Sequence, residues 1–137
     1  MEIRVYYEDT DSGGVVYYAS YLRFMERART EFFRRRGLEP AAWDGEGGLF
    51  MVARAEVDYR APGRYDDLLE VDTRVCGLRR AGFTFRHEIR RKGTGELLVE
   101  GRIRMACVGP DGRPRRLGER VRKVLGEALA GEEGIPT

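Results

Sequence analysis

The sequence predicts an α+β fold in which a five-stranded antiparallel sheet closes around one long helix and a second helix ends the chain. Five segments alternate between apolar and polar residues, which is typical of strands that bury one face. Two other segments repeat apolar residues at steps of three and four, as helices with one buried side do. The chain has 137 residues, the size of one ordinary domain. We expect a single domain over residues 1–130 and a flexible tail over 131–137.

The first strand and the long helix lie on either side of a short turn. Residues 2–7 alternate, so Tyr7 is expected on the buried face of a strand. The helix is expected to begin at Ser20, a residue type that caps helix N-termini, and to end at Arg36, before Gly37. The apolar residues at helical spacing within it are Tyr21, Phe24, Met25, Ala28 and Phe32.

Four more strands follow a loop that holds Pro40 and the glycines of 45–48. They are expected over residues 50–60, 68–78, 82–91 and 96–108. The connections at 79–82 and 92–95 are too short for a parallel crossover, so we predict an antiparallel meander. In the first of these strands, the alternation predicts that the core-facing residues are Ala53, Ala55, Val57 and Tyr59.

The closing helix is expected over residues 118–130, where Val121, Val124, Leu125 and Ala128 recur at helical spacing. One long helix cannot cover both faces of a five-stranded sheet. An edge strand or the far face is therefore expected to meet another copy of the chain. We predict a homodimer at least, and the choice between this dimer and a tetramer assembled from it is left open.

Composition and charge exclude several classes of function. Net charge is +2 and arginines are mixed with acids along most of the chain, so no basic field predicts nucleic-acid binding. Cys76 and Cys107 lie in apolar alternating runs without CxxC spacing, which indicates buried, reduced thiols and no metal site. No apolar run reaches the roughly 18 residues of a membrane helix, and the first residues do not resemble a signal peptide, so we expect a cytoplasmic protein.

The turn Asp9-Thr10-Asp11-Ser12-Gly13-Gly14 places two carboxylates directly before the long helix. One interpretation is structural, because Asp side chains commonly accept hydrogen bonds from free backbone N–H groups in turns. The other is catalytic, because N–H groups at a helix start stabilise a developing oxyanion while a carboxylate attacks a carbonyl or activates water. The spacing alone leaves both interpretations open for Asp9 and Asp11.

The residues around this turn carry a resemblance to a known family. They resemble the hotdog-fold acyl-CoA thioesterases of the 4-hydroxybenzoyl-CoA thioesterase type, through Tyr7-x-Asp9-Thr10-Asp11-x-x-Gly14-Val15-Val16-Tyr17, Tyr21 and Glu26-Arg27-Ala28-Arg29. Within that type, the sequence is most similar to the bacterial branch associated with the Tol-Pal envelope cluster. The similarity continues through Val57-Asp58-Tyr59-x-Ala61-Pro62, Tyr65-Asp66-Asp67 and Arg79-Arg80.

The resemblance implies a hotdog fold with active sites at a dimer interface. It implies that Asp11 is the catalytic carboxylate, acting as nucleophile or general base in thioester hydrolysis. It also implies that the backbone N–H of Tyr18, at the start of the helix, polarises the thioester carbonyl. The implied substrate is an acyl thioester of coenzyme A or of acyl carrier protein, and no metal or cofactor is needed.

Tyr18 is a departure from the branch that the sequence resembles most. Members of that branch typically carry His at this position, in V-Y-H-A-S-Y, where this chain has Val16-Tyr17-Tyr18-Ala19-Ser20-Tyr21. A role for the backbone N–H survives the change. A side-chain role in orienting Asp11 or protonating the leaving thiolate is left open, as is the acyl preference.

Other residues are predicted to contact the substrate. These candidates are Gly14, Val15, Tyr17, Arg60, Arg79 and Arg80. The resemblance supports Arg79 and Arg80 as ligands of the coenzyme A phosphates, since guanidinium groups at a turn between strands suit phosphate binding. Arg60 is a weaker candidate for the same role.

Two further polar residues allow a structural and a catalytic interpretation. His87, the only histidine, lies between Phe85 and Ile89 on the apolar face of a strand, which favours a core histidine over a catalytic base. Glu26 is about one helical turn from Arg23 and Arg29, which favours surface pairing over a second catalytic carboxylate.

Two rival functions remain for this sequence. A non-catalytic acyl-CoA-binding or scaffold protein can have the same fold, because fold alone does not fix function. RNA binding through the arginine clusters is disfavoured by the interspersed acids. The sequence does not determine the acyl group or the choice between coenzyme A and acyl carrier protein.

Overall fold

The computed structural model describes residues 1–38 and 48–133, and it has the α+β architecture that the sequence predicts. In chain order, the elements are β1 (Glu2–Arg4), a 3-10 helix (Tyr7–Asp9), α1 (Ser20–Arg35), β2 (Leu49–Tyr59), β3 (Leu68–Arg79), β4 (Gly82–Arg91), β5 (Leu97–Val108) and α2 (Glu119–Glu133). The loop expected around Pro40 falls mostly within residues 39–47, and the tail expected over 131–137 is wrong at its start, because residues 131–133 continue α2; the rest of it is residues 134–137. Both stretches lie outside the described residues.

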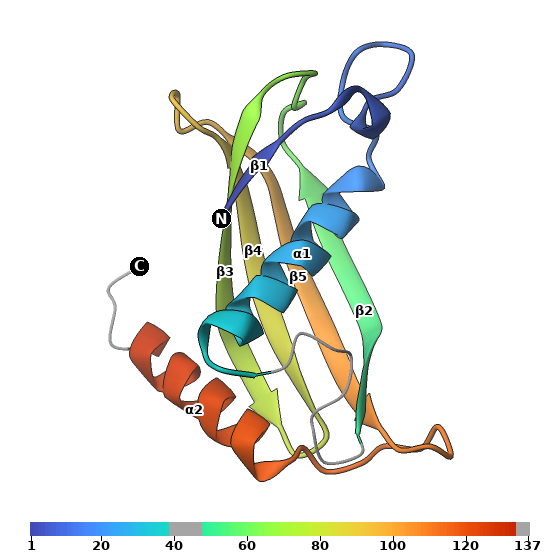
Figure 1. The fold of residues 1–137 in the computed structure, drawn as a ribbon, viewed down its shortest axis with the longest axis vertical. Coiled ribbons are helices and arrows are strands. Elements are labelled where there is room, and N and C mark those ends of the chain that lie inside the picture. Colours follow the sequence, from blue (N-terminus) through green and yellow to red (C-terminus); the bar gives the residue numbers. More distant parts are fainter. Residues whose placement is uncertain (39–47, 134–137) are drawn as a thin grey trace.

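All five strands form one antiparallel sheet in the order β1-β3-β4-β5-β2. Figure 1 shows α1 lying diagonally across one face of this sheet. Only β3, β4 and β5 form the predicted meander, so its extension to β2 was wrong. The short turns at 79–82 and 92–95 require hairpins, whereas the connection over 60–67 is long enough to carry the chain to the opposite edge.

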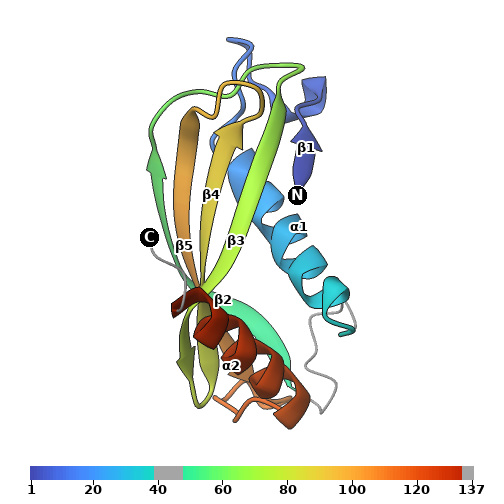
Figure 2. The ribbon, with the colours of Figure 1, turned by 90° about the vertical axis from the view of Figure 1, so that its left-hand side faces the viewer.

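The core lies between α1 and the sheet and continues beneath α2. Phe24 and Met25 of α1 are fully buried against Leu69, Ile89 and Val99. A second cluster joins the other end of α1 to α2, and it contains Phe32, Val75, Phe83, Phe85, Val121 and Leu125. Figure 2 shows α2 beside the lower end of the sheet, where β3 ends.

The C-terminal end of α1 is the one that the sequence predicts, whereas its N-terminal end differs from the prediction. Gly37 adopts φ 78°, a left-handed conformation that favours glycine, and it follows the helix as predicted. The N-cap is Ala19 instead of Ser20, and no side chain caps the helix there. Ser20 is the first residue of α1, and its hydroxyl donates to the carbonyl of Asp9 at 3.3 Å. The start of α1 is therefore fixed by the preceding turn.

Three expectations about burial were wrong. β1 ends at Arg4, and the chain then bends into the 3-10 helix, which leaves Tyr7 82% exposed. Of the predicted core residues of β2, only Val57 is even partly buried, because β2 is an edge strand with neighbours on one side only. Cys76 is exposed at an irregularity between Val75 and Gly77, whereas Cys107 is buried.

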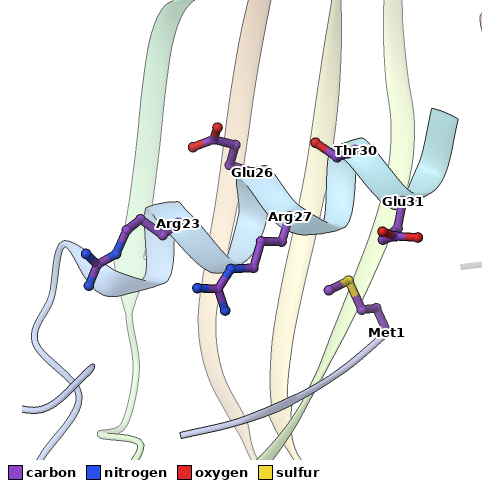
Figure 3. A pocket seen from close by; sticks show the side chains of 6 residues that line it. All are labelled: Met1, Arg23, Glu26, Arg27, Thr30 and Glu31. Carbon is purple, nitrogen blue, oxygen red and sulfur yellow. The ribbon is translucent and has the colours of Figure 1, made fainter. Parts of the chain in front are cut away.

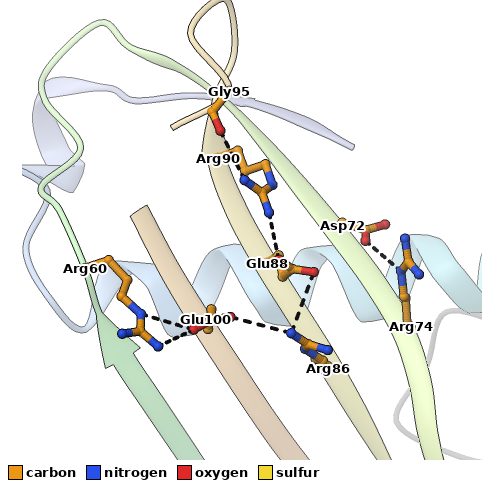
Figure 4. Close-up of polar contacts among 8 residues, drawn as sticks. All are labelled: Arg60, Asp72, Arg74, Arg86, Glu88, Arg90, Gly95 and Glu100. Carbon is orange, nitrogen blue, oxygen red and sulfur yellow. Dashed lines mark hydrogen bonds and ion pairs between the residues drawn. The ribbon is translucent and has the colours of Figure 1, made fainter. Parts of the chain in front are cut away.

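The sheet face that points away from α1 carries charged side chains in rows (Figure 4). Strand register places acids side by side in one row, Asp72, Glu88, Glu100 and Asp58, and arginines in the next, Arg74, Arg86 and Arg102. Like charges across strands are unfavourable. Ion pairs between rows offset this effect, such as Arg90 with Glu88 at 2.9 Å and Arg60 with Glu100 at 2.6 Å.

Candidate active site

Asp9 accepts hydrogen bonds from backbone N–H groups near it, through both its side chain and its carbonyl. Its carboxylate Oδ2 accepts a hydrogen bond from the Tyr6 N–H at 2.8 Å, and its carbonyl accepts from the Tyr17 N–H at 2.8 Å. The residue is only 5% exposed. The structural interpretation therefore holds for Asp9, which joins the end of the first strand segment to the start of α1.

Asp11 lies at the tip of a small hairpin and is exposed in the single chain. Its backbone N–H donates to the Val15 carbonyl at 2.9 Å, and its carbonyl accepts from the Gly14 N–H at 3.1 Å. Gly14 has φ 77°, so this turn requires a left-handed residue. One carboxylate oxygen, Oδ1, accepts from the Gly13 N–H at 2.8 Å. Among the described residues, the other oxygen makes no hydrogen bond.

The turn at 62–65 is joined to this hairpin by backbone hydrogen bonds. The Val16 N–H donates to the Gly63 carbonyl at 2.8 Å, and the Tyr65 N–H donates to the Gly14 carbonyl at 3.2 Å. A Cβ at Gly63 would lie 3.2 Å from both Val16 Cγ2 and Tyr21 Oη. Any larger residue at position 63 would therefore require Val16 and Tyr21 to shift by a few tenths of an ångström.

The N-terminus of α1 offers a free hydrogen-bond donor. The N–H groups of Tyr17, Ser20 and Leu22 donate to backbone carbonyls, but those of Tyr18, Ala19 and Tyr21 have no acceptor among the described residues, as is usual at a helix start. The carbonyl of Tyr18 accepts from the Tyr59 hydroxyl at 3.2 Å, which ties this peptide to the end of β2. A free N–H at the positive end of a helix dipole is a binding site for a negatively charged oxygen.

Tyr21 and Tyr59 fix this end of the helix. The Tyr21 hydroxyl accepts from the Gly63 N–H at 2.9 Å, and its ring contacts that of Tyr59 with centroids 5.8 Å apart. Burial raises the pKa of both phenols, so both stay protonated at neutral pH. The alternation of residues 50–60 predicted Tyr59 in the core, and no pattern marked Gly63. Nothing in the spacing indicated either role.

The structure gathers some of the predicted substrate residues and not others. Gly14, Val15 and Tyr17 belong to the hairpin and the helix start, and Arg60 follows Tyr59 at the same end of the sheet, paired with Glu100. Arg79 and Arg80 lie at the far end of β3, a 12-residue strand that spans about 40 Å. Within one chain, these two arginines are not brought to Asp11.

A separate groove of about 330 Å³ runs along the outer side of α1. Its lining residues are Met1, Arg23, Glu26, Arg27, Thr30 and Glu31 (Figure 3). Glu26 has no ion pair within 4.0 Å in the described part of the chain, although its charge acts on Arg29 and raises the pKa of that guanidinium against the larger, opposite effect of burial. Neither Asp11 nor Tyr18 lines this groove.

His87 is a core residue, as the sequence favours. It is fully buried, with Nε2 3.2 Å from the Arg29 guanidinium and Nδ1 3.0 Å from the Thr73 hydroxyl. Burial, and then the charge of Arg29, lower the pKa of His87 to about 3. Burial also lowers the pKa of Arg29, to about 10. Since the imidazole is neutral at physiological pH and enclosed by the core, it is not a solvent-accessible base.

Residues 1–38 and 48–133 contain neither a candidate metal-binding cluster nor a candidate membrane-spanning helix. No group of three or more His, Cys, Asp or Glu side chains in that part of the chain could hold a metal ion. No helix there is both long enough and apolar enough to cross a membrane.

A five-stranded antiparallel sheet packed on one long helix is the architecture of the hotdog fold. The chain belongs to the thioesterase-like superfamily, whose family model matches residues 5–129. It is therefore a thioester hydrolase, as the motif around Asp11 indicates.

Individual relatives agree with this membership. The chain is 44% identical over 108 residues to the acyl-CoA thioester hydrolase YbgC of Escherichia coli, covering 79% of this chain and 80% of that protein. It is 28% identical over 100 residues to the 4-hydroxybenzoyl-CoA thioesterase of a Pseudomonas species, covering 69% and 70%. The crystal structure of a probable thioesterase from Bartonella henselae superposes with a TM-score of 0.78 at 36% identity, covering 86% of this chain and 97% of that one.

Proposed function

We propose that the protein hydrolyses acyl-CoA thioesters, with Asp11 as general base or nucleophile and the Tyr18 backbone N–H as the donor to the thioester carbonyl. The observation that carries the proposal is the free Tyr18 N–H at the positive end of α1, beside the turn that presents Asp11. The names of the YbgC relatives support coenzyme A as the carrier of the acyl group.

The proposed reaction forms an acyl–oxygen bond and breaks the acyl–sulfur bond. Either Asp11 removes a proton from water as the water attacks the carbonyl carbon, or its free oxygen attacks that carbon and water then hydrolyses the acyl-enzyme. In both routes the Tyr18 N–H stabilises the negative charge that develops on the carbonyl oxygen. The products are a carboxylic acid and free coenzyme A.

The leaving thiolate does not require a catalytic acid from the protein. A simple thiol has a pKa of about 8.5, so the thiolate of coenzyme A leaves readily and is protonated by water. Tyrosine in place of the histidine of the Tol-Pal-associated branch is compatible with this reaction, since only the Tyr18 backbone is used. We propose that no metal or other cofactor takes part.

The finer placement of the protein rests on its motif. We place it with the 4-hydroxybenzoyl-CoA type, and within that type with the Tol-Pal-associated branch, because the residues from Tyr7 to Tyr21 follow that pattern apart from Tyr18. We retain Arg60, Arg79 and Arg80 as candidate ligands of the coenzyme A phosphates. Because Arg79 and Arg80 lie far from Asp11 in one chain, they are proposed to act on a substrate held by another subunit.

We also propose that the active enzyme is a homodimer joined through β2. This edge strand has one free side, and it exposes apolar side chains that include Met51 (51%), Val52 (53%) and Tyr59 (49%). Long apolar edges of this kind pair with another strand. Such pairing would cover the exposed side of the helix start, where Tyr59 contacts Tyr18.

The decisive variant is Asp11→Asn, which keeps the size of the side chain and its bond from the Gly13 N–H. We expect a loss in kcat of at least ~100-fold with little change in melting temperature, because a general base is removed. A panel of acyl-CoAs of graded chain length with a thiol-trapping dye measures the rates and reveals the acyl preference.

Two outcomes would decide against the proposal. Full activity of the Asp11→Asn variant would remove Asp11 from the mechanism. Binding of acyl-CoA by the wild-type protein without turnover of any thioester in the panel would favour the non-catalytic binding protein.

A further inference from the structure

Two neighbouring N–H groups precede the first residue of α1. Neither the N–H of Tyr18 nor that of Ala19 has an acceptor in the part of the chain that the structure describes. Both come directly before Ser20, where the helix begins, so both lie at the positive end of its dipole. Free N–H groups at a helix start can bind the same negatively charged oxygen. The Ala19 N–H is therefore a second candidate donor beside that of Tyr18.

The two N–H groups belong to peptide groups that are held in different ways. The Tyr18 N–H shares its peptide group with the Tyr17 carbonyl, which accepts from the Ser20 N–H at 2.8 Å. The Ala19 N–H shares its peptide group with the Tyr18 carbonyl, which accepts from the Tyr59 hydroxyl at 3.2 Å. The first peptide group is thus held by the backbone, whereas the second is held by one side chain.

The Tyr59 hydroxyl takes the place of a missing helical hydrogen bond. In a regular α-helix, the N–H of Leu22 would donate to the Tyr18 carbonyl, four residues earlier. In this protein the Leu22 N–H donates to the Ala19 carbonyl instead, at 3.2 Å. Within residues 1–38 and 48–133, the Tyr59 hydroxyl is therefore the only donor to the Tyr18 carbonyl.

Tyr59 is held in place by the sheet and by a neighbouring ring. It is the last residue of β2, which ends beside the start of α1 (Figure 1), and its backbone pairs with Val99 of β5. Its ring contacts the buried ring of Tyr21, whose hydroxyl accepts from the Gly63 N–H at 2.9 Å. The position of the Tyr59 hydroxyl is therefore set by elements other than the helix start to which it donates.

We propose that Tyr59 is a positioning residue, which orients and polarises the Ala19 N–H as a second donor to the thioester carbonyl oxygen. The inference rests on the proposed thioester hydrolysis. The C=O and N–H of a trans peptide group point in opposite directions, so a bond to the Tyr18 carbonyl fixes the direction of the Ala19 N–H. Accepting this bond also polarises the peptide group and strengthens its N–H as a donor. The effect is larger in the transition state, where the substrate oxygen gains negative charge.

The first test compares two variants that each lose one tyrosine hydroxyl. Tyr59→Phe removes the donor to the Tyr18 carbonyl. Tyr65→Phe is the matched control, because Tyr65 adjoins the Asp11 hairpin and its hydroxyl makes no hydrogen bond within the described residues. With acyl-CoA, Tyr59→Phe should lower kcat about 10-fold and change KM less than about twofold, since the bond acts mainly in the transition state. Tyr65→Phe should keep both constants.

The second test asks whether Tyr59 acts through the Ala19 N–H. Lactic acid incorporated in place of Ala19 converts this N–H into an ester oxygen and keeps the methyl side chain. Removing a donor to the oxyanion should lower kcat by at least ~100-fold. In that background Tyr59→Phe should lower kcat no further, because the N–H on which it acts is absent. Losses that multiply would show that Tyr59 acts in some other way.

A spectroscopic test separates this inference from the proposed function. Infrared difference spectra record the isotope-labelled thioester carbonyl of an acyl-CoA bound to the Asp11→Asn protein. Hydrogen-bond donors polarise the carbonyl, so binding should shift its band to lower frequency. The shift should be smaller when Tyr59→Phe is added and unchanged when Tyr65→Phe is added. This measurement requires binding and no turnover, so it tests Tyr59 independently of hydrolysis.

Three results would contradict the inference about Tyr59. A rise in KM with unchanged kcat in Tyr59→Phe would assign the hydroxyl to substrate binding. Equal losses in Tyr59→Phe and Tyr65→Phe would show that the bond to the Tyr18 carbonyl has no special effect. An equal carbonyl shift with and without the Tyr59 hydroxyl would show that it does not act on the donor. A wild-type protein that hydrolyses no thioester would instead contradict the proposed function, and the infrared comparison would still decide the role of Tyr59.

Discussion

Two aspartates separated by one residue have different environments in this protein. Asp9 is buried and bonds the Tyr6 N–H, whereas Asp11 is exposed at a hairpin tip. The sequence motif predicted a carboxylate turn before a helix, and that arrangement is present. The division of roles was left open because it depends on which way each side chain turns. That direction is set by the contact of the hairpin with the turn at 62–65.

This division predicts different effects on stability. Asp9→Ala should lower the free energy of unfolding by about 1–2 kcal/mol, because the partly buried Tyr6 N–H loses its acceptor. Asp11→Ala should change it by less than about 0.5 kcal/mol, since the side chain is exposed. Thermal and urea unfolding followed by circular dichroism measures both. Equal destabilisation by the two variants would contradict the assignment.

At the level of the elements, the alternation of apolar and polar residues predicted the bounds of the strands well, but it did not predict which strands lie next to each other. The bounds of β4 are those expected, and β3 and β5 differ by one residue at one end. Strand order was only partly predicted because apolar periodicity reports burial of a face and not the identity of the adjacent strand. The place of β2 at the free edge could not be inferred, since its pattern resembles that of an inner strand.

The contact between α1 and β5 depends on Gly101. A Cβ at this position would lie 2.5 Å from Met25 Cε and 2.7 Å from Met25 Sδ, and Met25 is fully buried. Gly101→Ala should therefore cost about 1–3 kcal/mol of stability through overpacking. The same change should cost less in a Met25→Leu background, which urea unfolding of the four proteins in a double-mutant cycle would detect. Additive costs would show that Met25 is not the obstacle.

The contact between α1 and β4 makes stability depend on pH. His87 has a folded-state pKa of about 3 against about 6.5 when unfolded, so the unfolded chain binds its proton first as pH falls. The stabilising contribution is complete above about pH 6.5. It is lost progressively down to about pH 3, by up to ~1.4 kcal/mol per pH unit, because burial, and then the charge of Arg29, disfavour the protonated imidazole.

His87→Gln separates this effect from the titration of the carboxylates. Urea unfolding of both proteins at pH 7, 5.5 and 4.5 should give a stability difference that shrinks as pH falls, since only the wild-type protein loses the histidine contribution. A constant difference across this range would show that His87 is not buried in its neutral form.

Whole-molecule properties followed least from the sequence. A net charge of +2 conceals a sheet face on which acids and arginines are paired, because a charge total does not record position. The fold brings the arginines of residues 113–123 beside Arg79 and Arg80 through backbone contacts between α2, its preceding loop and the β3–β4 turn. Sequence clusters of two or three arginines gave no sign of this assembly.

The proposed dimer gives the last prediction, at the scale of the whole molecule. Val52 is 53% exposed on the edge strand. In a single chain, Val52→Lys therefore places a charge on an exposed surface and should change the free energy of unfolding little. In a dimer joined through β2, the same ammonium group would be desolvated without a partner, which strongly disfavours association. We expect light scattering to show twice the chain mass, or four times it for a tetramer, in the wild-type protein and the single mass in the variant. Thioesterase activity should fall with the loss of the dimer, because the helix start at Tyr18 would be left uncovered. The control is Glu56→Lys, on the charged face of the same strand, which should keep both the wild-type mass and the wild-type activity. A Val52→Lys protein that retains the wild-type mass would exclude β2 as the interface, and a monomeric variant with full activity would show that one chain forms the complete site.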